Sequence, residues 1–193
     1  MKTFLAENFN YSANLVEKVS KDEAFLSQLS KIIDVLVETC RNKNIIYSCG
    51  NGGSMADAIH FAEEMSGRFQ DNRAGLPAIA ISDPGHISCV GNDYGYDFIF
   101  SRFLESVGKE NDILFGVSTS GKSKNVIEAV KAAKKLNIKT ICLLGKDGGE
   151  LKDLCDYPLI VPDQITHRIQ EIHIQCIHNI IEGVEREIFP QNY

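Results

Sequence analysis

Tryptophan is absent from the 193-residue sequence, and so are long apolar runs. The longest apolar stretches, such as residues 141–144, fall far short of the roughly 20 residues that cross a bilayer, so we expect no membrane partner. The apolar core of a signal peptide is also missing, because polar side chains begin at Lys2 and Thr3. The sequence therefore predicts a cytoplasmic protein.

Clustered basic charge is lacking as well. The 20 Lys and Arg residues are outnumbered by 26 Asp and Glu residues, which gives a formal net charge of −6. Because contacts with phosphates dominate nucleic-acid affinity, an acidic chain without a basic stripe is a poor nucleic-acid binder. The local group of Lys131, Lys134 and Lys135 is typical of a solvated helix face. Nucleic acid is therefore not an expected partner.

Paired cysteines are the third absence. The six cysteines are widely spaced, and no two of them form a CxxC pair. This argues against a thiol redox motif and against a clustered cysteine zinc site. The 44% of hydrophobic and 24% of charged residues are ordinary for a globular protein, and the length favours one domain over two. What remains is an enzyme or a binding domain of a reducing compartment.

The spacing of apolar residues changes along the chain. In residues 2–43 and 165–188 they recur every three or four positions, which predicts helices. Between these segments the sequence has short continuous apolar runs, at residues 45–49, 78–81, 113–117, 140–144 and 159–161. Continuous runs separated by helix-length segments, such as 54–65 and 123–136, indicate buried parallel strands.

The expected fold is therefore α/β, a three-layer αβα sandwich with a five-stranded parallel sheet. We expect a single domain over residues 1–193, with residues 1–43 as an N-terminal helical extension and a further helix at the C-terminus. The apolar stripe of that last helix is wide and is matched by the N-terminal helical hairpin. It suggests a subunit interface as well as a core.

Two strand ends carry unusual loops. Residues 48–54 read Ser-Cys-Gly-Asn-Gly-Gly-Ser, and residues 117–123 place several hydroxyl side chains before a helix. Ligands of open parallel sheets bind beyond the carboxyl ends of the strands, and helix N-termini attract anions. Such loops suit a phosphate monoester, whose oxygens accept hydrogen bonds from hydroxyl and backbone N–H groups. The alternative is that Ser54 and the serines of the second loop are ordinary helix caps.

A second motif lies in the same stretch. Residues 116–123 fit G-x-x-x-x-G-K-[ST], the nucleotide-binding P-loop. Three observations oppose this interpretation. Gly116 lies inside an apolar strand run, Pro162 precedes Asp163 where a clean strand-plus-Asp magnesium site would be needed, and the loop at residues 51–54 stays unexplained.

Candidate acid–base groups come from helices. His60 and Glu64 are four residues apart and share a helix face, and His173 and His178 lie among isoleucines of the last helix. The first pair could equally be an ordinary ion pair on one helix face. The two histidines of the last helix could equally be ordinary core residues. Spacing alone therefore predicts a phosphate loop but no reaction.

Taken together, these residues resemble the sedoheptulose 7-phosphate isomerase family of the sugar-isomerase, or SIS, fold. The resemblance covers nearly the whole chain and runs in order through residues 48–54, 60–64, 77–83, 86–93, 118–121 and 168–173. It implies an aldose–ketose isomerase that converts sedoheptulose 7-phosphate to D-glycero-D-manno-heptose 7-phosphate. That product opens nucleotide-activated heptose biosynthesis for lipopolysaccharide or capsule.

The resemblance also implies roles for individual residues. Glu64 is the expected base and His178 the expected acid. Similar enzymes bind zinc through residues that match His60, Glu64, Gln170 and His178, and they are homotetramers with shared active sites. The implied substrate contacts are Asn51, Gly52, Gly53, Asn92, Asp93, Ser118, Thr119, Ser120, Ser123 and Gln170.

The implied zinc site poses a geometric problem. Gln170 and His178 are eight residues apart, which is ~12 Å along a helix and ~80° around it. Both reach one ion only if their side chains lean toward each other, if the helix is distorted, or if the two helices belong to different subunits. We expect one weakly held, chelator-sensitive zinc per subunit, with His60 and Glu64 near a partner's His178.

One departure and two alternatives accompany the resemblance. His167 stands where an acidic residue is expected before the run at residues 168–171, so it is left out of the site. A noncatalytic SIS-fold regulator that binds a replication initiator protein would lack the glutamate and the helical histidine, whereas Glu64 and His178 are both present. A sugar-phosphate sensor would differ only in lacking turnover.

Overall fold

The computed structural model describes every residue from Met1 to Tyr193. Its elements in chain order are α1 (Lys2–Ser20), α2 (Glu23–Arg41), β1 (Ile46–Gly50), α3 (Gly53–Ser66), β2 (Ala78–Ala80), α4 (Pro84–Asp93), the 3₁₀ helix η1 (Tyr96–Phe98), α5 (Ser101–Val107), β3 (Ile113–Ser118), α6 (Lys124–Lys135), β4 (Lys139–Gly145), α7 (Leu151–Leu154), β5 (Tyr157–Val161), α8 (Thr166–Ile188) and the 3₁₀ helix η2 (Pro190–Asn192). No helix among them has both the length and the apolar character that crossing a membrane requires.

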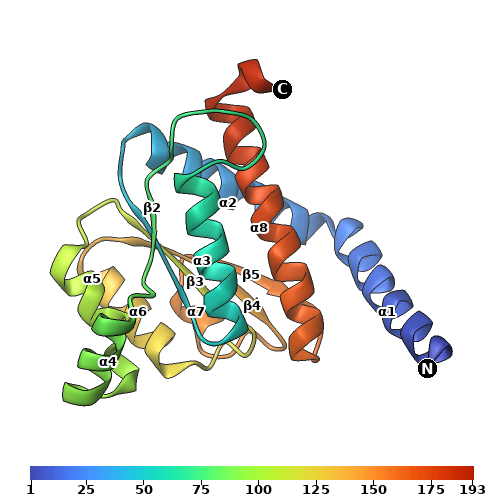
Figure 1. Ribbon diagram of the computed structural model, residues 1–193, viewed down its shortest axis with the longest axis horizontal. Helices are drawn as coiled ribbons and strands as arrows, with labels where there is room; N and C mark the ends of the chain where they lie inside the picture. The colour runs from blue at the N-terminus through green and yellow to red at the C-terminus, as the bar shows by residue number, and fades with distance from the viewer.

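The five strands form one sheet in the order β2-β1-β3-β4-β5, and every pairing is parallel (Figure 1). This confirms the expected α/β fold, and all five apolar runs of the sequence become strands. From β1 the chain passes to β2 on one side and then to β3 on the other. The gap between β1 and β3 is therefore the topological switch point, the place where ligands bind in such sheets.

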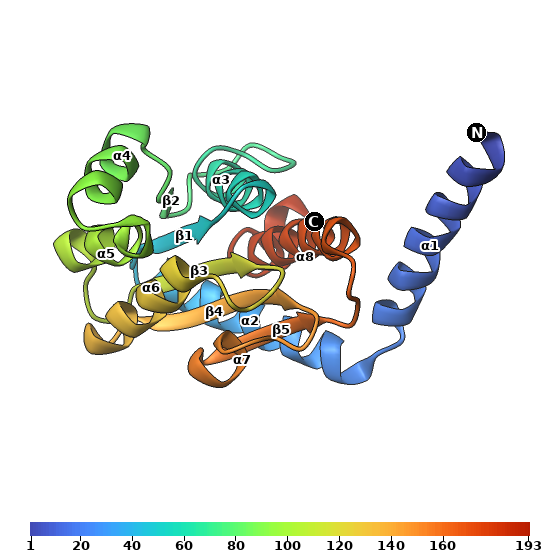
Figure 2. The same cartoon turned by 90° about the horizontal axis from the view of Figure 1, so that it is seen from below.

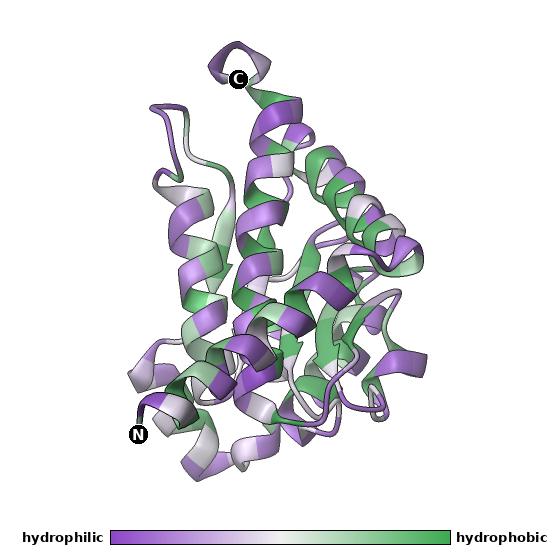
Figure 3. Ribbon diagram, turned by 90° about the vertical axis from the view of Figure 1, so that its right-hand side faces the viewer, coloured by the Kyte–Doolittle hydropathy of each residue, from purple (hydrophilic) through white to green (hydrophobic).

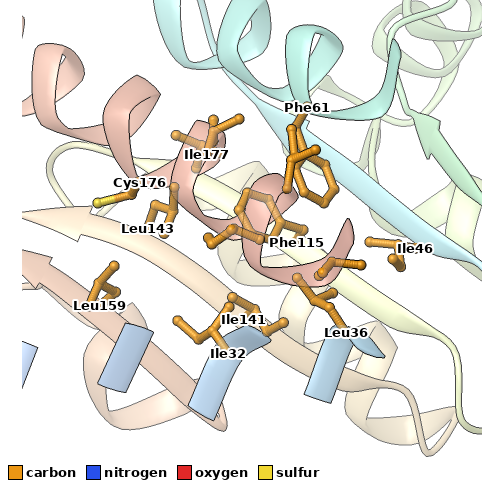
Figure 4. Close-up of a cluster of buried hydrophobic side chains, with 14 of the residues drawn as sticks. Ile32, Leu36, Ile46, Phe61, Phe115, Ile141, Leu143, Leu159, Cys176 and Ile177 are labelled. Carbon is orange, nitrogen blue, oxygen red and sulfur yellow. The ribbon is translucent and has the colours of Figure 1, made fainter. Parts of the chain in front are cut away.

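Helices cover both faces of the sheet. Among the helices, α2, α3 and α8 supply most of the buried cluster on one face, and α5 and α6 most of the cluster on the other face. Phe61 of α3 stacks on Phe115 of β3 with the ring centroids 4.4 Å apart (Figure 4). This contact fixes the rotation of α3 on the sheet.

The N-terminal helices differ from the expected hairpin. Helix α1 projects away from the body instead of folding back along α2 (Figure 2), and only Leu15 and Val19 of α1 are buried. Polar contacts hold it, including a hydrogen bond of 2.8 Å from the Tyr11 hydroxyl to Asp163. Phe4 and Phe9 are 57% and 76% exposed. The unpartnered apolar surface of the extension therefore lies on α1.

The apolar stripe of α8 forms part of the core, as the sequence predicts. Its isoleucines, together with Cys176 and Val184, are buried in the core of the same chain. The ribbon coloured by hydropathy is green along the strands and purple on the outward surfaces of the helices (Figure 3). The width of the stripe is thus explained by contacts of α8 with α2, α3 and the sheet, and it does not require a second subunit.

His173 is a fully buried histidine at the centre of α8. Its Nε2–H donates to the Leu144 carbonyl over 2.9 Å, while Nδ1 has no partner. Burial lowers the pKa of His173 from 6.5 to about 4. In the unfolded chain the imidazole regains its ordinary pKa, so between pH 6.5 and pH 4 the unfolded state binds a proton that the folded state does not.

Lowering the pH should therefore destabilise the folded protein through this one residue. We expect the free energy of unfolding to lose about 3 kcal/mol from His173 as the pH drops from 7 to 4. His173→Gln keeps a donor for Leu144 but does not titrate, so its stability should depend less steeply on pH. Urea denaturation of both proteins at several pH values measures the difference. Equal pH dependence in the two proteins would contradict the assignment.

Candidate active site

The loops that follow β1 and β3 lie side by side at the switch point. Asn51 and Asn125 join them through two reciprocal amide hydrogen bonds of 2.8 Å each. The Tyr96 hydroxyl of η1 donates a further hydrogen bond of 3.0 Å to Oδ1, the side-chain amide oxygen of Asn51. The packing thus brings together the two loops that the sequence predicts as phosphate-binding. The Asn51 side chain itself is already engaged by protein groups.

The serines of the second loop do not act as helix caps. No side chain caps α6, because the Ser123 hydroxyl lies 3.0 Å from that of Ser118 instead of turning back to the helix. Helix α3 likewise has no side-chain cap, because its N-cap residue is Gly52, whose φ of 55° favours glycine. The hydroxyl groups and the positive ends of two helix dipoles therefore face the same switch point, which suits a phosphate.

The loop after β4 holds the second loop in place. A Cβ atom on Gly121, which has φ +63°, would lie 1.9 Å from the Gly148 carbonyl oxygen, and the Leu151 N–H donates to the Gly121 carbonyl over 3.1 Å. Lys122 points to Asp147, with Nζ 3.2 Å from Oδ2, and both side chains are exposed. Gly116 is buried inside β3, so the P-loop motif lacks its glycine in the loop.

A second cluster lies further along α3. The Nε2 atom of His60 is 3.0 Å from Oε1 of Glu64, and Nε2 of His178 is 3.9 Å from Oε2 of the same carboxylate. Glu64 is 15% exposed and the two imidazoles about 40%. Helices α3 and α8 run side by side in Figure 1, which brings the three residues together. The expectation that His178 reaches Glu64 from a partner chain is therefore wrong, since one chain supplies all three.

The donor set of this cluster fits a zinc ion. The ligand atoms of His60, Glu64 and His178 all lie within 4.8 Å of one another. Ligands about 2.1 Å from a tetrahedral zinc are roughly 3.4 Å apart, so only small movements are needed. The Oε2 atom of Glu64 is buried and lacks a hydrogen-bond partner, which leaves a lone pair for a cation.

Gln170 is the expected ligand that the structure does not bring to this cluster. Its amide lies against Gly53, where a Cβ atom would be 2.5 Å from Nε2. Gly53 begins α3, and Glu64 lies 11 residues later, which is roughly 16 Å along the helix axis. Within one chain, Gln170 therefore belongs with the phosphate loops and not with Glu64.

The remaining predicted contacts lie at the edge of the site. Asn92 and Asp93 end α4, are exposed and bond to each other over 2.7 Å. Their connection to the loops runs through η1, whose Tyr96 reaches Asn51. Sequence reasoning missed Tyr96, because nothing in the spacing of this segment marks a site.

Asp57 is another residue that sequence reasoning missed. It lies one turn before His60 on α3, and its buried Oδ2 atom has no hydrogen-bond partner. Burial raises the pKa of Asp57 to about 6, and the nearby His60 opposes the rise. The spacing of Asp57, His60 and Glu64 along one helix face was the signal that could have identified it.

Comparisons with known proteins agree with this geometry. A family model described as SIS domain matches residues 7–145. The chain is 48% identical to a phosphoheptose isomerase of Fusobacterium nucleatum, over 98% of this chain and 97% of the relative. The solved phosphoheptose isomerase of Neisseria gonorrhoeae matches with a TM-score of 0.89 and 37% identity, covering 95% of this chain and 98% of the other. That of Francisella tularensis matches with a TM-score of 0.89 and 32% identity, covering 95% and 97%.

Proposed function

Because the chain belongs to the phosphoheptose isomerase family of SIS-domain proteins, we propose that Glu64 is the base with which it isomerises sedoheptulose 7-phosphate to D-glycero-D-manno-heptose 7-phosphate. The chain is an isomerase of this family, and the reaction belongs to heptose biosynthesis. The observation that carries the role of Glu64 is the position of its mostly buried carboxylate between His60 and His178.

The reaction requires proton transfers that this cluster can make. A ketose becomes an aldose when a proton leaves the carbon beside the carbonyl and returns to the former carbonyl carbon, through an enediol. One carboxylate can make both transfers, which is the role of Glu64. His178 moves the hydroxyl proton from one oxygen to the next and assists ring opening. The phosphate loops hold the far end of the sugar, so remote binding energy orients the reacting end.

The same three residues would hold a zinc ion, one per subunit. His60, Glu64 and His178 supply two imidazoles and a carboxylate, a set that leaves a fourth position for water or substrate. When bound, zinc polarises the substrate carbonyl as a Lewis acid. The exposed imidazoles make the ion accessible to chelators.

Zinc binding is testable without an activity assay. We expect wild-type protein to take up one zinc per chain and to lose it to a chelator. His60→Ala should bind zinc at least about tenfold more weakly, because it removes one of three protein ligands. His167→Ala is the matched control, since His167 is exposed and lies outside the cluster. A zinc titration followed by elemental analysis measures the affinity and the zinc content of each variant. Equal affinity in wild type and His60→Ala would place the metal elsewhere.

A complete active site needs two chains. Glu64 lies roughly 16 Å along α3 from the phosphate loops of its own chain, whereas the substrate spans roughly 9 Å from its carbonyl carbon to phosphorus. Leaning of the Glu64 side chain toward the helix N-terminus shortens this gap but does not close it. The loops of a second copy therefore hold the phosphate while this copy supplies Glu64, and the second copy's loop region brings its own Gln170 as a further metal or substrate ligand.

This sharing fits a homotetramer. The exposed apolar residues of α1, which include Phe4, Leu5 and Phe9, provide a surface that a second copy would cover. The whole chain acts as a single domain over residues 1–193, with residues 1–43 as a helical extension. Asn51, Gly52, Gly53, Ser118, Thr119, Ser120 and Ser123 cradle the phosphate, and Asn92 and Asp93 contact the sugar.

The proposal extends to the setting of the reaction. The product feeds lipopolysaccharide or capsule heptose, in the cytoplasm, without a nucleic-acid or membrane partner. A noncatalytic regulator is disfavoured because both Glu64 and His178 lie in the cluster. Incubation of the protein with sedoheptulose 7-phosphate, followed by NMR, tests the function. Appearance of the aldose signal is the expected result, and binding without any aldose would leave a sugar-phosphate sensor.

A further inference from the structure

Arg73, in the segment between α3 and β2, lies under the end of the helix that carries Glu64. Its guanidinium donates to the Glu64 carbonyl over 2.6 Å, to the Met65 carbonyl over 2.7 Å and to the Gly67 carbonyl over 3.0 Å. The last carbonyls of a helix have no partner within the helix and carry its partial negative charge. Arg73 therefore binds the C-terminal end of α3 by both hydrogen bonds and charge.

The same guanidinium is tied to α8. Nε lies 2.6 Å from Oε1 of Glu185, and both side chains are 1% exposed. The Tyr193 hydroxyl donates to the other oxygen of Glu185 over 2.9 Å, so the carboxylate has two partners. Glu185 lies two turns after His178, on the same side of α8. One buried charge pair thus connects the two helices that carry the proposed base and the proposed acid.

A buried ion pair is a poor device for stability alone. Removing two charges from water costs several kcal/mol, and apolar residues of similar volume often replace such pairs without loss. What the planar guanidinium fork provides is a fixed direction for each hydrogen bond. Here those directions fix the backbone of Glu64 relative to α8.

We propose that Arg73 is a positioning residue for the isomerase reaction: through Glu185 it clamps the end of α3 to α8 and so holds the Glu64 carboxylate against His60 and His178. This inference rests on the proposed role of Glu64. Arg73 makes no hydrogen bond to any of the three cluster side chains, so its effect passes through the backbone of α3. The phosphate loops lie at the opposite end of α3 and are outside its reach.

The clamp predicts a separation of kcat from KM. Arg73→Met should lower kcat about 100-fold, the size of effect expected from a misplacement near 1 Å, and change KM by less than about threefold. Arg73→Lys, which keeps the charge and part of the hydrogen bonding, should recover part of the loss. Val130→Ala, in the core on the other face of the sheet, is the control for destabilisation and should keep kcat.

The double variant Arg73→Met/Glu185→Leu separates positioning from stability. It removes the unpaired buried carboxylate, so the melting temperature should return toward that of wild type. If Arg73 acts by positioning Glu64, kcat stays low in the double variant although the protein is stable again. Recovery of kcat together with stability, or normal kcat in Arg73→Met, would overturn the inference. If Glu64→Gln is inactive while the Arg73 variants are fully active, only this inference fails, whereas an active Glu64→Gln removes the proposed function itself.

Discussion

Glu64→Gln should fold and bind sedoheptulose 7-phosphate but lose turnover by about 1,000-fold or more, the range expected when a general base is removed. Glutamine has the shape of glutamate but cannot accept the proton from the sugar carbon. KM should change little, because the phosphate loops are untouched. Aldose formation followed by NMR gives kcat, and circular dichroism establishes that the variant is folded.

The neighbouring glutamate is the matched control. Glu63 is exposed on the same helix and belongs to neither cluster, so Glu63→Gln should keep wild-type kcat. Both substitutions remove one negative charge from α3, so a general charge effect would appear in both. Activity near that of wild type in Glu64→Gln would remove Glu64 from the role of base.

The second large effect is expected from mixing two inactive proteins. Glu64→Gln lacks the base, and Ser120→Asp places a carboxylate where the substrate phosphate binds. If each active site takes Glu64 from one chain and the loop from another, random hybrids restore roughly a quarter of the wild-type activity, because half of the chains supply each part. Co-expression of the two variants with different affinity tags, followed by purification through both tags, provides the hybrids.

The control mixes two separate variants that are both altered in the acid–base cluster. One chain supplies both Glu64 and His178 to a site. In hybrids of Glu64→Gln with His178→Ala every site therefore lacks one of the two groups, and the hybrids should stay inactive. A failure of Glu64→Gln and Ser120→Asp to restore activity, in hybrids shown to contain both chains, would mean that one chain holds the complete site. The distance argument along α3 would then be wrong.

The sheet could be predicted from sequence because each strand is a short apolar run that ends at a turn residue. The α4 and α5 helices could not, because they are short and lack a long apolar stripe. Pro84, with Asp83 as N-cap accepting from the His86 N–H over 2.7 Å, was a local start signal that the pattern analysis did not use.

The site was predictable in part for the same reason. The phosphate loops follow strands, and strand ends of a parallel sheet meet at one edge, so the loops could be grouped without coordinates. Contacts between distant segments could not be found this way. The Asn51–Asn125 pair joins residues 74 positions apart, and Arg73–Glu185 joins residues 112 positions apart. Periodicity describes the face of a helix but not the helix that lies opposite, which is why His178 was assigned to a partner chain.

The loose attachment of α1 has a consequence for the proposed homotetramer. A helix of 19 residues with only two buried side chains gains little from tertiary packing, and isolated helices of this length are marginal in water. The backbone amides of α1 should therefore exchange with solvent quickly in a free chain and slowly in an assembled one. In the homotetramer proposed above, dilution that separates the chains would melt α1 first and leave the sheet folded, so the helicity of α1 would report the concentration at which the subunits associate.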